Sequence, residues 1–151
     1  MDVSYVNPFI NATLTWVKNM VGVEAKTLAP QLKRPPFPHY DISGVIGLSG
    51  GAAGSISFGF PMQSAVAIVS KMIQAPIKED DADLIDAIGE IVNIVAGFAK
   101  RDLTHLNLSI SLPNVILSNH ILAGLSGAPT IVVPFTCPLG SFAMEVSLKT
   151  N

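Results

Sequence analysis

A carboxylate and a carboxamide stand three residues apart near the middle of the chain, at Glu90 and Asn93. The surrounding pattern is Asp86-x-x-x-Glu90-x-x-Asn93-x-x-x-Gly97. At about 100° per residue of an α-helix, these four positions fall within roughly 60° of one another on one side. A carboxylate pairs with cations, whereas an amide both donates and accepts hydrogen bonds. The spacing therefore predicts a polar stripe that offers charge pairing and two-way hydrogen bonding side by side.

A helix over residues 79–103 would carry this stripe. Acidic residues crowd its start, and Lys100 and Arg101 lie near its end, as the helix dipole favours. A separate side of the same helix is apolar, with Leu84, Ile88, Ile91, Val92, Val95 and Ala99. That band predicts a helix that packs on a sheet and leaves its polar stripe uncovered.

Two glycines, Gly89 and Gly97, border the stripe. A glycine inside a helix costs about 1 kcal/mol relative to alanine, so each needs a reason. One explanation is close packing against a strand, and the other is the close approach of another protein. Glu90 and Asn93 by themselves are equally consistent with a solvated helix surface, because a short Glu-x-x-Asn pattern occurs by chance in many helices.

The remaining patterns predict two more helices and about six strands. One helix covers residues 2–22, with Asn7-Pro8 marking its start or a kink; its apolar face would be Val3, Val6, Ile10, Leu14, Val17 and Val21. The other opens at Pro61 and ends near Gln74. Strand-like runs cover residues 23–28, 39–48, 55–60, 106–111, 129–137 and 141–149, with a turn around 126–127. We expect an α+β fold over residues 1–151 as a single domain, an antiparallel sheet of about six strands with three helices packed on it.

An internal repeat is indicated by three matches at one offset. Gly140 to Met144 resembles Gly54 to Phe58, and 140 − 54 = 86. At the same offset Asn7 falls on Asn93, and residues 45–49 fall on 131–135. The pattern predicts a duplicated unit of one helix and several strands, joined by the helix that follows Pro61.

Composition narrows the possible partners. Charged residues make up only 13% of the chain, against about 25% in an ordinary soluble domain. Such a surface favours a partner that covers part of it, for instance a second copy of the chain. The net charge of −2 supplies no basic surface, so nucleic acid is not an expected ligand.

Neither membrane insertion nor a metal site of its own is expected. Residues 43–70 and 106–144 lack charge, but Gly, Pro, Ser and Asn interrupt both stretches, and no run of about 20 apolar residues survives. The N-terminus lacks the basic residues of a secretory signal, and a single cysteine fits a reducing cytoplasm. His39, His105 and His120 show no metal-ligand spacing.

The motif and its surroundings resemble the CheC/CheX/FliY phosphatases of bacterial chemotaxis. The resemblance covers nearly the whole chain and includes Asp2-Val3-x-Tyr5-Val6-Asn7-Pro8-Phe9, Val45-Ile46-Gly47-Leu48-Ser49-Gly50-Gly51-x-x-Gly54-Ser55 and Ser111-Leu112-Pro113-x-Val115. Relatives of the CheC type carry the motif on two helices, and those of the CheX type carry it on one. Here Ser4 replaces Glu90 in the first repeat, so the chain resembles the CheX type.

This resemblance implies a cytoplasmic protein phosphatase that hydrolyses the aspartyl phosphate of a CheY-like response regulator. Asn93 would enter the receiver domain and position the attacking water, and Glu90 would pair with the receiver's lysine. Asp86, Gly89 and Gly97 would form the docking face. The receiver would supply Mg²⁺, the chain would need no cofactor of its own, and it would form a homodimer through edge strands.

Two other functions remain open at this stage. The chain could be a binding module for receiver domains or for a chemotaxis deamidase, without catalysis, or it could serve a structural or flagellar-switch role on the same fold. Phosphate release from a phosphorylated receiver separates catalysis from binding.

Overall fold

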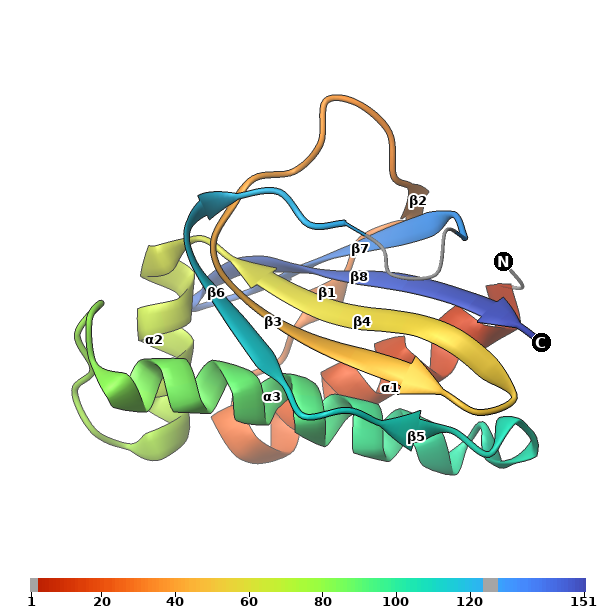
Figure 1. The fold of residues 1–151 in the computed structure, drawn as a ribbon. Coiled ribbons are helices and arrows are strands. Elements are labelled where there is room, and N and C mark those ends of the chain that lie inside the picture. The colour runs from red at the N-terminus through yellow and green to blue at the C-terminus, as the bar shows by residue number, and fades with distance from the viewer. Residues whose placement is uncertain (1–2, 124–127) are drawn as a thin grey trace.

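The computed structural model describes residues 3–123 and 128–151, which build one eight-stranded antiparallel sheet with helices across one face (Figure 1). Two short turns, Val3–Tyr5 and Val17–Val21, flank α1, and a third, Thr104–Leu106, follows α3. The main elements are α1 (Val6–Trp16), β1 (Lys26–Thr27), β2 (Gln31–Leu32), β3 (Tyr40–Ser49), β4 (Ala52–Phe60), α2 (Met62–Ile73), α3 (Ala82–Arg101), β5 (Ser109–Ile110), β6 (Asn114–His120), β7 (Thr130–Cys137) and β8 (Gly140–Thr150). This arrangement confirms the expected α+β class.

The sheet has an approximate two-fold organisation. Its strand order is β1-β7-β8-β4-β3-β5, with β2 also paired to β7 and β6 to β3. At its centre Phe58 of β4 lies opposite Met144 of β8, and 144 − 58 = 86 is the offset of the sequence repeat. The repeat axis therefore passes between these two residues, with a hairpin on each side and α1 and α3 as the paired helices (Figure 1).

One of the three repeat matches is wrong by three positions. Val45 pairs with Ser57, and the counterpart of Ser57 at offset 86 is Ala143. Ala143 pairs with Pro134, so the structural counterpart of Val45 is Pro134 and not Ile131. The register of each hairpin is fixed by its own turn, and the two turns differ in sequence.

The core lies between the sheet and the helices and is rich in aromatic residues. Trp16 of α1 packs against Phe58 and Phe142, with ring centroids 6.4 and 6.1 Å apart, and Phe135 stacks on Phe142 at 5.2 Å. The buried face of α1 accordingly includes Phe9 and Trp16, while Ile10 and Leu14 of the expected face are only half-buried. The helix is rotated this way because the two large aromatic side chains bury more apolar surface.

The helices agree well with the sequence patterns and the strands less well. Pro8 lies in the first turn of α1, directly after the turn Val3–Tyr5, so of the two expected alternatives the helix starts there. The run 106–111 keeps strand geometry only at Ser109–Ile110. The short β2 and the longer β6 were not predicted. Most of β6 is exposed and it shows no alternation, so its geometry comes from pairing with β3. The turn predicted at 126–127 lies outside the described residues.

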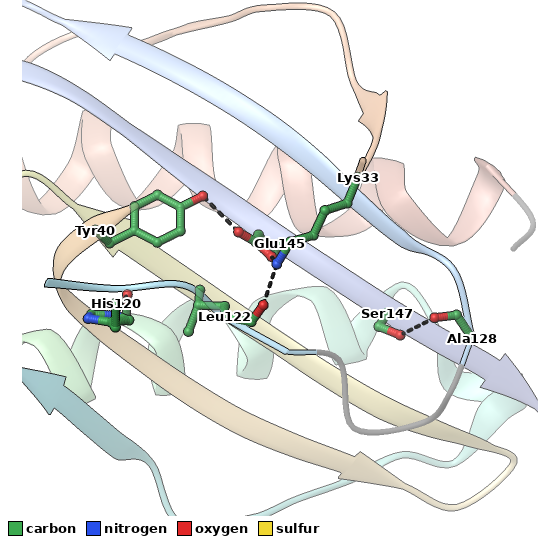
Figure 2. A network of polar contacts seen from close by, with 8 residues as sticks. Lys33, Tyr40, His120, Leu122, Ala128, Glu145 and Ser147 are labelled. Atoms are coloured by element: carbon green, nitrogen blue, oxygen red, sulfur yellow. Dashed lines mark hydrogen bonds and ion pairs between the residues drawn. The ribbon is translucent and has the colours of Figure 1, made fainter. Parts of the chain in front are cut away.

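Polar contacts hold the connections on the other face of the sheet (Figure 2). Lys33, from the connection before β3, forms a buried ion pair of 2.6 Å with Glu145 of β8 and donates to the carbonyl oxygen of Leu122. The Tyr40 hydroxyl donates to the same carboxylate at 2.8 Å. Burial, reinforced by the charge of Glu145, raises the pKa of Tyr40, so the phenol stays protonated as a donor. Both connections are thereby tied to a central strand.

Candidate functional site

The polar stripe lies on α3 as expected. Asp86, Glu90 and Asn93 are exposed, whereas the six apolar residues of the opposite band are fully buried: Leu84, Ile88, Ile91, Val92, Val95 and Ala99. Glu90 and Asn93 are separated by about 4.5 Å along the helix axis. The structure thus brings the predicted carboxylate and amide together on one rigid, well-anchored surface.

Close contact between α3 and β3 holds the stripe in place. A Cβ atom on Gly44 of β3 would lie 2.9 Å from the carbonyl oxygen of Ile88, so this strand position has no room for a side chain. The helix therefore sits directly on the backbone of β3. Rotation of α3 about its axis would drive Ile88 and Val92 out of the core, which fixes the direction in which Glu90 and Asn93 point.

Neither functional group forms a polar contact with another described residue. Among residues 3–123 and 128–151, the Glu90 carboxylate and the Asn93 amide have no hydrogen-bond or ion-pair partner. Their hydrogen-bonding capacity is satisfied by solvent until another molecule replaces it. This leaves both groups available to an incoming protein.

Charge is distributed unevenly along the exposed side of α3. Asp83, Asp86 and Glu90 occupy its first half, and Lys100 and Arg101 its last turn. Arg101 lies over the ring of Phe98, 5.4 Å from its centroid. The end of the stripe that carries Glu90 therefore attracts a cationic group, and the opposite end repels it.

The two glycines beside the stripe have different surroundings. A Cβ on Gly97 would meet nothing within 4 Å, so close packing does not explain this glycine. Gly89 is buried, and a Cβ there would lie 3.5 Å from the side chains of Pro113 and Val115. These distances are ordinary van der Waals contacts, so an alanine side chain would also fit at Gly89, and close packing does not require a glycine at either position.

An open groove of about 490 Å³ runs between α3 and the start of β6. Its lining consists of Ile85, Asp86, Gly89, Glu90, Pro113, Asn114 and Val115. The sequence patterns missed the wall that β6 contributes, because a helical pattern cannot tell which strand lies beside the helix. Pro113 was singled out in the sequence only as part of the motif Ser111-Leu112-Pro113-x-Val115, which resembles the family.

The first repeat does not reproduce this arrangement. Asn7 is exposed on α1, but Ser4 lies in the preceding 3-10 turn and not in the α-helix. The spacing of an α-helical pair therefore does not hold between these two residues. The first repeat has an amide at Asn7 and a serine, not a carboxylate, at the position equivalent to Glu90.

Within the described ranges, no three His, Cys, Asp or Glu side chains are grouped so that they could hold a metal ion. The helices in that part of the chain are all too short or too polar to cross a membrane.

Comparison with known proteins gives consistent matches. A family model described as chemotaxis phosphatase CheX matches residues 42–136, which include the whole of α3. The CheY-P phosphatase CheX of Thermotoga maritima is 32% identical over all of this chain and 99% of its own length.

Solved structures share the fold. A CheC-like superfamily protein from a Shewanella species is 31% identical, with a TM-score of 0.90 and coverage of 99% of both chains. In the CheX–CheY–BeF3–Mg²⁺ complex of Borrelia burgdorferi, the matching chain is 23% identical, with a TM-score of 0.82 and coverage of 96% of this chain and 97% of that one.

The open space at Gly97 leads to a prediction about stability. Gly97→Ala should raise the free energy of unfolding by about 1 kcal/mol, because alanine is the better helix former and its methyl group meets no neighbour. Gly44→Ala should lower it, because its methyl group would clash with the Ile88 carbonyl. Urea denaturation of both variants checks this, and a destabilised Gly97→Ala would show that this position is packed.

Proposed function

The chain belongs to the CheX family of chemotaxis phosphatases, and we propose that it hydrolyses the aspartyl phosphate of a CheY-type receiver domain with Asn93 and Glu90 of α3. The observation that carries the proposal is an exposed amide and carboxylate, both without partners in the described chain, on a helix locked to the sheet. The relative from Thermotoga maritima, which is 32% identical, is named a CheY-P phosphatase.

In this proposal Asn93 positions the attacking water. The amide oxygen accepts a hydrogen bond from the water, whose oxygen then attacks phosphorus as the bond from phosphorus to the aspartyl oxygen breaks. The proton of the water leaves with the phosphate, since a carboxamide does not take up a proton at neutral pH. Holding water in line replaces a random encounter, and a 100-fold acceleration requires only about 2.7 kcal/mol.

Glu90 serves as the anchor that sets the register of the two proteins. Its carboxylate faces outward one helical turn from Asn93 and is free to pair with the lysine beside the phosphorylated aspartate of the receiver. Closure of the interface excludes water and strengthens this charge-assisted hydrogen bond. The acidic first half of α3, with Asp83 and Asp86, favours the same cation.

The metal ion belongs to the partner in this mechanism. The receiver holds Mg²⁺ next to its phosphoryl group, and this chain contributes neither a ligand nor a cofactor. Receivers of this class are cytoplasmic, and we propose the same compartment for this chain.

Each chain has one active site in this proposal. On α1 the amide of Asn7 has Ser4 in the place of a carboxylate, and Ser4 lies in a 3-10 turn. An amide without an anchoring charge does not hold water in line over the phosphorus.

We also propose a homodimer formed through β6. This strand pairs with β3 along one edge, and no strand pairs with its other edge in the described part of the chain (Figure 1). Residues 114–120 contain no Asp, Glu, Lys or Arg to discourage pairing, and Ile116 and Leu117 are exposed. Such an edge favours a second copy that continues the sheet.

The amide is tested by Asn93→Ala. Dephosphorylation of a phosphorylated CheY-type receiver should fall to the receiver's own rate. The free energy of unfolding should be kept, because the exposed Asn93 has no hydrogen bond to another described residue and alanine favours the helix. The matched control is Asn7→Ala on α1, which should leave turnover near that of the wild type.

Two outcomes would contradict this assignment. Wild-type turnover in Asn93→Ala would exclude the amide as the water-positioning group. Receiver binding by the wild-type chain without any phosphate release would show a binding module instead of an enzyme.

The carboxylate is tested by comparing Glu90→Ala with Glu90→Lys. Both should weaken receiver binding, and the lysine variant should do so more, because it sets two ammonium groups against each other across the interface. Titration calorimetry with the receiver at low and at high salt measures both affinities. Equal affinities for the two variants would mean that Glu90 does not face a cation.

The dimer is tested by Leu117→Glu at the centre of β6. In an antiparallel pair of β6 strands this change brings two like charges close together, so the mass measured by light scattering should fall from dimer to monomer. The control is Leu32→Glu on β2, at the opposite edge of the sheet. The two leucines are similarly exposed, with 47% for Leu32 and 43% for Leu117. A wild-type chain that is already monomeric would exclude the proposed dimer.

A further inference from the structure

Leu112 projects into solvent immediately beside the groove at Glu90. Its exposed fraction is 86%, and the next most exposed large apolar residue in the described chain is Leu28, at 52%. A single exposed leucine is common on protein surfaces and carries no conclusion by itself. Two further features, the fixed backbone around Leu112 and its position beside the groove, indicate a role in binding.

The backbone on both sides of Leu112 is fixed to the fold. On one side the Ser111 amide donates to the Gly47 carbonyl at 3.0 Å, and the Gly47 amide donates to the Ser111 hydroxyl at 2.8 Å. That hydroxyl donates in turn to the Leu112 carbonyl at 3.0 Å. On the other side the Pro113 ring packs over Gly89, with 3.5 Å between its Cγ and a Cβ placed there.

This double attachment presents an apolar side chain from a rigid support. Proline restricts its own φ and also the conformation of the residue before it, which is Leu112. The backbone therefore loses little freedom when the side chain is covered by a partner. A leucine side chain held in this way is preorganised for contact with another protein. No described residue of its own chain covers it.

Leu112 is also continuous with the site on α3. Pro113, its neighbour, lines the same groove as Asp86 and Glu90. The connection between β5 and β6 runs alongside α3 for part of its length (Figure 1). A protein that contacts Glu90 and fills this groove covers Leu112 as well.

We propose that Leu112 is the apolar anchor of the receiver-docking surface, a specificity-determining contact beside the polar pair Glu90 and Asn93. This inference rests on the proposed function. Leu112 would pack on an apolar patch of the receiver and exclude water from the groove, which strengthens the ion pair of Glu90. It does not touch the reacting atoms, so it acts on binding and not on the chemical step.

The test is steady-state phosphate release from a CheY-type receiver that has been phosphorylated by a small phosphodonor and freed of it. Leu112→Ala should raise KM about tenfold and leave kcat unchanged, because the buried methyl groups are lost from the interface. Leu112→Asp should raise KM further. The matched control, Leu28→Ala, lies at the opposite edge of the sheet and should change neither constant.

Each other result has a distinct meaning. Wild-type phosphate release with an unchanged KM in both Leu112 variants would overturn the anchor and leave the proposed function standing. No release by the wild type would overturn the proposed function itself. A fall in kcat together with a lower melting temperature would show that Leu112 is structural. Loss of dimer mass in Leu112→Asp with an unchanged KM would assign Leu112 to a second copy.

Discussion

α3 packs so closely on β3 that only a glycine, Gly44, fits beneath the carbonyl oxygen of Ile88. Six fully buried side chains on the same side of the helix keep it there, and none of them can leave without opening a cavity. The polar stripe on the other side inherits this rigidity. Among the described residues, Glu90 and Asn93 have no hydrogen-bond or ion-pair partner, so their side chains remain available to another molecule.

The two faces of the sheet are stabilised by different physics. One is covered by helices through an apolar core with stacked aromatic rings, whereas the other holds its connections by a buried ion pair and hydrogen bonds around Glu145. A buried charge without its partner is costly, so Lys33 and Glu145 depend on each other. These contacts lie on the face of the sheet away from α3, so they do not involve the surface beside Glu90.

The approximate two-fold axis at Phe58 and Met144 places two similar helices on the same sheet, and only one of them carries both functional groups. The difference begins locally. Pro8 lies in the first turn of α1, and the preceding residues form a 3-10 turn, so the position equivalent to Glu90 is neither acidic nor in α-helical geometry. The fold tolerates this loss because the exposed side of α1 contributes little to the core.

The sequence by itself determined the helices, the α+β class, the family and the composition of the polar stripe. The helices, the fold class and the stripe depend on periodicity or on residue type, which are local properties of the chain, whereas the family was indicated by the resemblance of its motifs. It did not show that β6 forms a strand, that Gly89 is covered while Gly97 is open, or that Leu112 lies beside the stripe. Nor did it show that the first strands of the two hairpins, β3 and β7, are offset by three residues from the sequence repeat. Only the tertiary structure decided these points, because strand pairing and the neighbours of a helix depend on residues far apart in the chain, whose contacts leave no local pattern.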